Sequence, residues 1–481
     1  MTFADLVDRR AATDPDGAAI ADSALTLTNA GLLARVQAAA AALAEAGIGA
    51  GDVVAVRLVN RVELVVLLFA AWRLGATVTP VNPALTAAEV ARQLADSGAK
   101  VAVVEDGTSV GGDVVALAVS DLPAEPPADV PEPLVDAAAL ALLIYTSGTT
   151  GVPKGVMLDH ANLDAMTAMG RDALGIGPDD RCLLILPLFH VNGIVVSVLL
   201  PLLVGASVVI ADRIDPQTFF DSVEAHRPTF FSAVPTIYGM LAALPADVRP
   251  DTSSVRFAIC GAAPAPAVLL TRFEERFGFP LVEAYGLSEG TCGSATNPVD
   301  GLRKPGTVGL PFPGQEIRIL GADGAVAAEG DIGEVEVRGA NVMRGYLGRP
   351  ADTAAVVVDG WLRTGDLGRL DEDGYLSIVG RSKEMIIRGG ENIYPKEIED
   401  VLAADPAVQE VAVIGVPDEK WGEIVVAFLQ PRPGAVIDLD AIGARCAESL
   451  SRYKRPAAIH VLEALPKNAV GKLDKTRLAQ P

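Results

Sequence analysis

The stretch from Tyr145 to Gly155 reads YTSGTTGVPKG and follows an apolar run over residues 139–144 that is typical of a buried strand. Glycines let a ligand approach the backbone closely, and successive backbone N–H groups in such a loop form a concave anion site. Hydroxyl groups add donors, and a lysine adds a mobile positive charge. The order is not that of a Walker loop. The stretch predicts polyphosphate binding, with a plain Ser/Thr/Gly surface loop as the alternative; the candidate residues are Thr146, Ser147, Gly148, Thr149, Thr150 and Lys154.

The whole chain has 481 residues and a formal net charge of −22 at pH 7. Such an acidic chain is not expected to bind nucleic acid without sequence preference, because that binding needs basic surfaces. The N-terminus lacks the basic start and apolar core of a signal peptide, so we expect a cytoplasmic protein. No C-x-x-C spacing occurs, which favours reduced thiols over disulfides or zinc ligands, at Cys182, Cys260, Cys292 and Cys446.

Residues 182–211 contain no Asp, Glu, Lys or Arg and are long enough to span a bilayer. Prolines and glycines interrupt this segment, including Pro187, Gly193 and Pro201. A strand, a short helix and a second strand inside a protein core therefore fit better than a membrane span.

Helical and strand patterns alternate along the first part of the chain, with helices over residues 63–74 and 87–97 between short apolar strands. This alternation predicts parallel α/β sheets covered on both faces. After about residue 300 the chain becomes rich in Gly and Pro, with short alternating strands that predict an antiparallel sheet or small barrel-like part. We expect an α/β fold with a large N-terminal domain over residues 1–382 and a small mobile α+β domain over residues 383–481.

Further motifs follow in a fixed order: LPLFHVNG from residue 186, GAAPAP from 261, EAYGLSE from 283, WLRTGD from 361, GRSK from 380, RGGENIYPKEIE from 388 and LPKNAVGK from 465. Together with the loop at 145–155, this set resembles the adenylate-forming superfamily of acyl-CoA and aryl-CoA synthetases, peptide-synthetase adenylation domains and luciferases. The resemblance covers nearly the whole chain. Ser288 replaces the more usual threonine of the Tyr-Gly-x-Thr-Glu motif but keeps its hydroxyl group.

The resemblance implies a nucleotide site for ATP and Mg²⁺. Thr146 and Glu289 would hold the metal, a hard cation that takes few carboxylates and shares substrate phosphates. Lys472 would be the catalytic lysine, and the domain would rotate about Lys383. The remaining nucleotide and thiol contacts would come from Gly261, Ala262, Ala263, Glu283, Ala284, Tyr285, Gly286, Leu287, Ser288, Asp366, Arg381, Lys383, Gly389 and Gly390.

The same resemblance places the acid at His190, Val191, Asn192, Tyr238, Ala262, Ala284, Gly286 and Thr291. These residues include no arginine or lysine. Malonyl-CoA synthetases of this family carry an arginine where this chain has Ala284. Amino-acid-activating members carry an aspartate after a phenylalanine, and this chain has no such aspartate after Phe230 and Phe231. We therefore expect an uncharged acyl or aryl tail, with short to medium fatty acids first, and a role in fatty acid metabolism.

The expected reaction is ATP-dependent activation of the acid to acyl-AMP, followed by thioester formation with coenzyme A, with catalytic roles for His190, Ser288, Glu289 and Lys472. One alternative acceptor is the phosphopantetheine of a carrier protein, which has the same thiol arm. Another alternative is a non-catalytic nucleotide or acyl binder. A membrane fatty-acid carrier would rest on residues 182–211 alone. The sequence does not distinguish a monomer from a homodimer.

Overall fold

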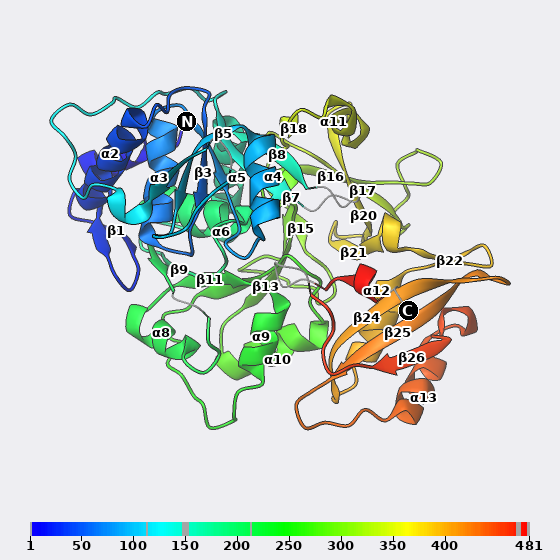
Figure 1. Cartoon of the computed structure of the whole chain (residues 1–481). Coiled ribbons are helices and arrows are strands. Elements are labelled where there is room, and N and C mark those ends of the chain that lie inside the picture. Colours follow the sequence, from blue (N-terminus) through cyan, green and yellow to red (C-terminus); the bar gives the residue numbers. More distant parts are fainter. Residues whose placement is uncertain (1, 112–113, 147–152, 212–213, 468–472, 479–481) are drawn as a thin grey trace.

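The computed structural model describes residues 2–111, 114–146, 153–211, 214–467 and 473–478. Figure 1 shows a large N-terminal body of layered sheets and helices, with the C-terminal part of the chain beside it as a separate smaller lobe. An α/β N-terminal body with a smaller C-terminal domain confirms the predicted fold class.

The first sheet carries the quoted stretch at one end. Its inner strands are parallel, and β7 and β8 form an antiparallel hairpin in which Thr146 pairs with Lys154. The sequence pattern predicted β7 but not its partner, because the apolar residues of β8 follow the loop without a turn signal. In spatial order the strands are β18 (Gly345–Tyr346), β8 (Lys154–Asp159), β7 (Leu140–Thr146), β4 (Thr77–Pro80), β3 (Val53–Arg57), β5 (Ala99–Val104) and β6 (Val115–Ala118).

Helices cover both faces of this sheet, as the alternation predicted. Every residue of α3 (Val62–Arg73) except Glu63 is buried, because this helix is apolar on all sides. On the opposite face α4 (Ala87–Ser97) is amphipathic, starts with a capping box at Thr86 and ends at Gly98 in a left-handed conformation. The other helices of this half are α1 (Leu6–Thr13), α2 (Asn29–Glu45), α5 (His160–Leu174) and the short 3₁₀ turn η1 (Val119–Asp121).

The second sheet shares the largest hydrophobic core with the first, since Val54 and Leu142 of one sheet and Leu184 and Ile210 of the other lie in the same buried cluster. Its spatial order is β15 (Leu310–Pro311), β14 (Ala295–Thr296), β13 (Leu281–Tyr285), β12 (Phe257–Cys260), β11 (Phe230–Ala233), β9 (Arg181–Leu184), β10 (Ser207–Ile210), β1 (Ala18–Ala21) and β2 (Thr26–Thr28). Its outer face is covered by α8 (Phe219–His226), α9 (Pro235–Ala242) and α10 (Ala267–Phe277).

The uncharged segment forms a strand, a helical stretch and a second strand, as predicted: β9, then α6 (Val191–Ile194), η2 (Val195–Leu199) and α7 (Leu200–Leu203), then β10. Within the described residues no helix has both the length and the apolar composition needed to cross a membrane. All four cysteines are buried and unpaired.

A third sheet packs beside these two. It is antiparallel and contains the short strands that were predicted after about residue 300. Its hydrogen-bonded order is an open path rather than a closed barrel, with β21 added to β20. The elements of this part are β16 (Glu316–Leu320), β17 (Gly333–Arg338), β20 (Trp361–Leu370), β19 (Val357–Val358), β21 (Leu376–Arg381) and α11 (Pro350–Val356).

The C-terminal lobe has its own buried cluster, drawn from residues 386–450. A long hairpin, β24 with β25, forms its centre, and the helices α12 and α13 cover that hairpin. Its elements are β22 (Ile386–Arg388), β23 (Glu391–Ile393), α12 (Pro395–Ala403), β24 (Val408–Asp418), β25 (Gly422–Pro431), α13 (Leu439–Ser449), β26 (Ala458–Val461) and the 3₁₀ turns η4 (Ser382–Glu384), η5 (Arg452–Lys454) and η6 (Lys475–Arg477).

Candidate active site

A chain of contacts joins the predicted phosphate loop to the predicted metal carboxylate. Thr146 and Lys154 face each other across the end of the β7–β8 hairpin. The Nζ atom of Lys154 lies 2.9 Å from the carboxylate of Asp352 and 5.0 Å from the centre of the Tyr346 ring. The hydroxyl group of Tyr346 donates to Oε1 of Glu289 over 2.8 Å. Residues far apart in the sequence therefore meet at one edge of the first sheet.

Glu289 lies in the one-turn 3₁₀ helix η3 (Ser288–Gly290), and the segment around Asn341 holds this turn in place. The Met343 N–H group donates to the carbonyl oxygen of Glu289 over 2.8 Å. Asn341 donates from Nδ2 to the carbonyl oxygen of Gly290, also over 2.8 Å. The orientation of Glu289 thus depends on residues about fifty positions further along the chain.

Tyr285, Asp366 and Arg381, three of the predicted nucleotide contacts, lie together in the structure. Asp366 is 4% exposed; its Oδ2 accepts from the Tyr285 hydroxyl over 2.7 Å, and its Oδ1 forms an ion pair with Arg381 Nε over 2.9 Å. Burial, together with the charge of Asp366, raises the pKa of Tyr285 well above its ordinary value, so the phenol stays a donor. Carboxylate oxygens have further lone pairs, so Asp366 can still accept from ribose hydroxyls.

The predicted adenine side lies at the ends of β12 and β13. Ala262 has a positive φ of 67°, so the backbone turns sharply directly after the strand. Glu283 is 5% exposed; its Oε1 accepts from the Ala265 N–H group over 3.1 Å, while its Oε2 has no partner among the described residues. Burial raises the pKa of this carboxyl group to about 7, with smaller effects from Lys396, which lowers it, and Asp400, which raises it. Ala263, Ala284 and Leu287 flank these positions in the sequence.

The loop before α6 forms the predicted acid side. Asn60 fixes this loop by donating to the Leu186 carbonyl over 2.9 Å and accepting from the Leu188 N–H group over 2.8 Å. His190 precedes the helix, with its ring centre 4.6 Å from that of Phe189. Val191 is buried, and Oδ1 of Asn192 is buried without a hydrogen-bond partner among the described residues. That these side chains border the acid stays a prediction.

Two of the predicted acid contacts lie in the protein interior. Tyr238 is 0% exposed, donates to the Ile259 carbonyl over 2.7 Å and packs edge-on against Phe273. Thr291 is also 0% exposed and donates to the Asn341 carbonyl. In this arrangement both side chains support the walls of the site from behind and offer no accessible surface to an acid.

The turn at Gly286 brings β13 and the Glu289 turn close together. A Cβ atom on Gly286 would lie 1.6 Å from the carbonyl oxygen of Cys292, so only glycine fits here without a backbone shift. Thr291 and Cys292 have positive φ values of 56° and 109°, which complete the reversal.

Lys396 and Asp400 of helix α12 lie near enough to Glu283 to influence its pKa slightly. Gly389 and Gly390 lie between β22 and β23, with the Trp421 ring filling the space beside Gly389. In Figure 1, β22 lies well away from β13. Lys383 lies exposed in η4.

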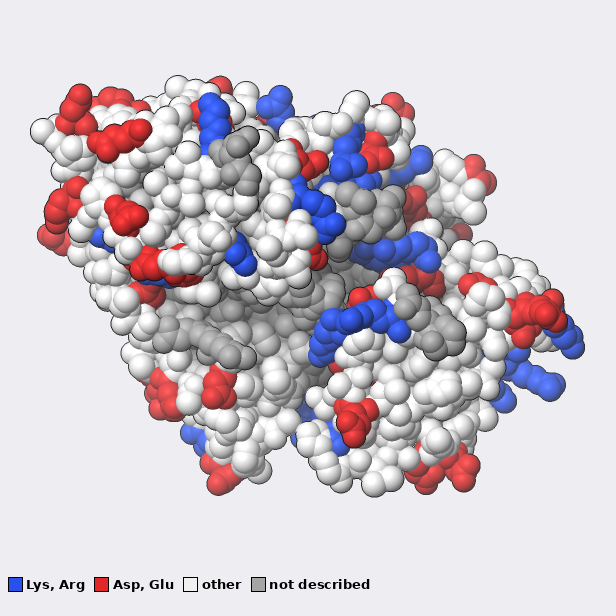
Figure 2. Space-filling view, viewed as in Figure 1, with Lys and Arg blue, Asp and Glu red and all other residues white. Residues whose placement is uncertain are grey.

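Several predicted residues lie outside the described residues: Ser147, Gly148, Thr149, Thr150 and Lys472. Figure 2 shows a hollow between the N-terminal body and the C-terminal lobe, with Lys and Arg side chains on its rim. A basic rim on an otherwise acidic protein favours phosphate groups as ligands.

Sequence reasoning missed Asp352, Asn341 and Tyr346. Their spacing along the chain gives no link to the phosphate loop. Only the pairing of β18 with β8, two residues long, brings Tyr346 beside that loop. The Gly345-Tyr346 pair forms β18, but a two-residue strand has no sequence pattern that would distinguish it from many other strand ends.

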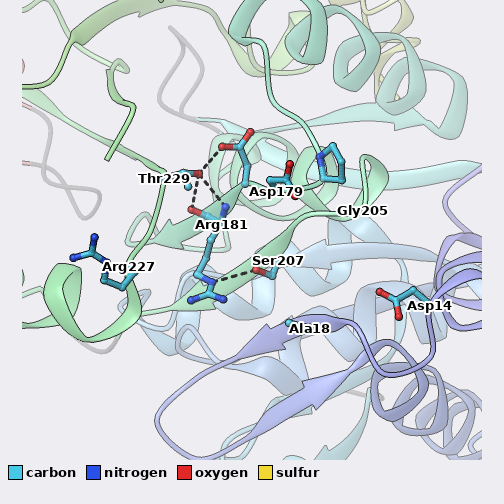
Figure 3. A pocket seen from close by; sticks show the side chains of 10 residues that line it. Asp14, Ala18, Asp179, Arg181, Gly205, Ser207, Arg227 and Thr229 are labelled. Atoms are coloured by element: carbon cyan, nitrogen blue, oxygen red, sulfur yellow. Dashed lines mark hydrogen bonds between the residues drawn. The ribbon is translucent and has the colours of Figure 1, made fainter. Parts of the chain in front are cut away.

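A polar pocket of about 380 Å³ lies elsewhere, at the amino ends of β9, β10 and β11. In Figure 3, Arg181 reaches across it to Ser207, while Arg227 and Asp14 stand at opposite sides. Ligands of open α/β sheets bind at the carboxyl ends of the strands. The main charged groups here also have protein partners: Asp180 binds Arg256, and Arg227 binds Asp251. This pocket is therefore not part of the candidate active site.

Comparisons with known proteins show the family of the chain. The family model described as AMP-binding enzyme matches residues 7–347, and the one described as AMP-binding enzyme C-terminal domain matches residues 397–472. The chain is 39% identical to the sulfoacetate–CoA ligase of Cupriavidus necator, over 99% of this chain and 97% of that protein. It is also 39% identical to a feruloyl-CoA synthase of an Amycolatopsis species, over 97% of this chain and 96% of that protein.

Solved structures of CoA synthetases and related proteins are also similar to this chain over nearly its whole length. ATP-bound MatB from Rhodopseudomonas palustris is similar with a TM-score of 0.93 and 34% identity, covering 100% of this chain and 99% of that one. The o-succinylbenzoate coenzyme A synthetase of Bacillus subtilis, in complex with ATP and magnesium ion, has a TM-score of 0.88 and 34% identity, covering 98% of each chain.

Proposed function

Because this chain belongs to the family of AMP-binding enzymes, we propose which of its residues carry out the ligase reaction and which acids it accepts. The chain is an AMP-forming acyl-CoA ligase that uses ATP, coenzyme A and a carboxylic acid. The carboxylate attacks the α-phosphorus of ATP, which forms acyl-AMP and releases pyrophosphate. The thiol of coenzyme A then attacks the carbonyl carbon, which forms the thioester and releases AMP.

One observation carries the assignment of residues: Lys154, Tyr346 and Glu289 form a continuous set of contacts beside the predicted phosphate loop. Phosphoryl transfer needs positioning and charge neutralisation more than covalent help from the protein. A lysine and an anchored carboxylate next to each other can supply both, the lysine toward phosphate oxygens and the carboxylate toward a bound cation.

Glu289 and Thr146 fit Mg²⁺ by the chemistry of their donors. Both are oxygen ligands, and Mg²⁺ in phosphate sites binds one or two carboxylates together with substrate phosphates and water. The Tyr346 hydroxyl occupies one position on Oε1 of Glu289 and leaves Oε2 for the cation. When bound, Mg²⁺ would offset part of the negative charge of the phosphates.

We assign the nucleoside to the other half of the site. Asp366 would accept from the ribose hydroxyls, with Tyr285 and Arg381 keeping its carboxylate oriented. The small side chains of residues 261–263 leave room for a flat adenine ring. The unpartnered Oε2 of Glu283 could accept from an amino group of the base. Lys472 would stabilise charge on the reacting phosphate, and the lobe from Lys383 onward would deliver it.

The acid, in our proposal, has an uncharged tail: a short or medium fatty acid, or an aryl acid. The residues that can border it are Val191, Asn192, Ala284 and neighbouring small residues, and none carries a charge. Burying a second carboxylate or a sulfonate without a charged partner would be costly. The feruloyl-CoA synthase among the relatives, at 39% identity, supports an aryl acid, whereas the sulfoacetate–CoA ligase, also at 39% identity, supports the charged acid that the screen below compares with it.

A screen of acids tests this proposal. We expect pyrophosphate release with hexanoate, octanoate and ferulate to exceed that with malonate, oxalate or sulfoacetate by at least about tenfold, since each unpaired buried charge costs more than 1.4 kcal/mol. A preference for a doubly charged acid would contradict it. Replacing coenzyme A with a holo-carrier protein in the same assay tests the alternative acceptor.

A further inference from the structure

Tyr346 lies between two groups of opposite charge and contacts both with different parts of its side chain. Its ring carries the Lys154 ammonium group on its face, 5.0 Å from the ring centre, and its hydroxyl donates to Glu289 over 2.8 Å. The residue is 9% exposed. A cation is attracted by the face of an aromatic ring, and a phenol is a good donor to a carboxylate.

Backbone pairing holds Tyr346 of β18 beside β8, the strand that begins with Lys154. Tyr346 pairs with Val156 in the β18–β8 ladder, beside each other in Figure 1, and its N–H group donates to Thr353 Oγ1 over 2.9 Å. The next residue, Leu347, donates to the Gly155 carbonyl over 2.8 Å. The backbone of Tyr346 is therefore bonded to the strand that carries Lys154, which fixes the relative position of the two residues.

The ring separates charges that would otherwise attract each other. Lys154 makes its ion pair with Asp352 and not with Glu289, whose Oε1 accepts from the Tyr346 hydroxyl. A lysine that closed directly on Glu289 would use up the charge of both groups. Lone carboxylates also rotate freely about their last torsion, because this torsion has broad minima. A neutral ring with one hydroxyl prevents both outcomes.

We propose that Tyr346 is a positioning residue: its hydroxyl orients Glu289 toward a divalent cation, and its ring keeps Lys154 available for phosphate oxygens. This inference rests on the proposed function, since it assumes that Mg²⁺ and ATP bind here. It adds a residue that no motif of the sequence identifies.

Two substitutions separate the two tasks. Tyr346→Phe removes the hydroxyl and keeps the ring, so ATP affinity measured by calorimetry with Mg²⁺ should fall about tenfold, the lower end of the effect of removing a partner of a metal ligand. ATP affinity in EDTA should stay unchanged, because Lys154 keeps its ring. Tyr346→Leu removes both groups and should weaken ATP binding in both conditions.

Tyr375 provides matched controls. It also donates from its hydroxyl over 2.7 Å, to the Leu302 carbonyl, and also carries a lysine, Lys304, 4.6 Å from its ring centre, but it contacts neither Lys154 nor Glu289 in these interactions. Tyr375→Phe and Tyr375→Leu should leave ATP affinity unchanged with and without Mg²⁺. A purely structural role for Tyr346 would lower both affinities equally in Tyr346→Phe.

The proposal is overturned if folded Tyr346→Phe, checked by its thermal midpoint, binds ATP with Mg²⁺ as tightly as the wild type. It is also overturned if this variant loses affinity equally in EDTA. A wild-type protein that neither binds ATP with Mg²⁺ nor releases pyrophosphate would instead refute the proposed function.

Discussion

Glu283 holds a buried carboxyl group of which only one oxygen has a partner among the described residues. Burial raises its pKa from 4.5 to about 7. The folded protein therefore keeps this proton up to about pH 7, whereas the unfolded chain releases it near pH 4.5. Between these values the free energy of unfolding decreases as the pH rises, by at most about 3 kcal/mol, since one pKa unit corresponds to about 1.4 kcal/mol.

Glu283→Gln should remove this decrease in the free energy of unfolding, because glutamine has the same shape as glutamate and no charge to bury. We expect the thermal midpoint of the variant, relative to the wild type, to rise between about pH 5 and about pH 8. Lys396 and Asp400 on α12 remain in place in both proteins. Glu372→Gln, at an exposed position, serves as control and should show the same difference at both pH values. A pH-independent difference for Glu283→Gln would contradict the buried state.

At the level of single residues, the sequence indicated Lys154, Glu289 and Asp366 by their motifs, but not the partners that hold them. Asp352, Tyr346 and Asn341 contribute through contacts that only the folded chain creates. Tyr238 shows the opposite error: its position near the site was inferred, but its side chain turns into the aromatic core around Phe273. Sequence patterns give the type of residue and not the direction in which it points.

Among the elements, the Gly286 turn gives a direct steric prediction. Gly286→Ala would place a methyl group 1.6 Å from the Cys292 carbonyl oxygen, so the backbone of the Glu289 turn must move. We expect a loss of stability of about 3 kcal/mol or more, with loss of pyrophosphate release. Differential scanning fluorimetry and the pyrophosphate assay measure these two effects.

A glycine in an open helical position provides the control for that substitution. Gly443 lies within α13, and a Cβ atom there would meet nothing within 4 Å. Gly443→Ala should stabilise the protein by about 0.5–1 kcal/mol, because alanine favours the helix. If Gly286→Ala left stability and activity as they are in the wild type, the close approach at Cys292 would be refuted.

The elements themselves were largely predictable where a long period exists. The helices at residues 63–74 and 87–97 were expected within about two residues of α3 and α4. Short strands such as β18 were not, because two residues have no periodicity. Of the two alternatives predicted after residue 300, an antiparallel sheet or a barrel-like part, the described strands form the antiparallel sheet.

At the scale of the whole molecule, the arrangement of the lobes gives different expectations for the two half-reactions. Lys396 and Asp400 of helix α12 influence the pKa of Glu283, while β22, which precedes Gly389 and Gly390, lies well away from β13 in Figure 1. If these glycines line the path of the thiol, the lobe must turn before thioester formation. Lys383 lies exposed in η4, at the start of that lobe, and is the proposed pivot.

Lys383→Pro should therefore separate the half-reactions. Proline fixes φ near −65° and restricts the residue before it, which opposes rotation of the chain at this point. We expect acid-dependent pyrophosphate release to stay within about threefold of the wild type and thioester formation to fall at least about tenfold, a barrier increase of about 1.4 kcal/mol or more. Lys383→Ala keeps a free backbone and should retain both activities. Equal losses of both half-reactions in Lys383→Pro would show that adenylation and thioester formation use the same lobe arrangement.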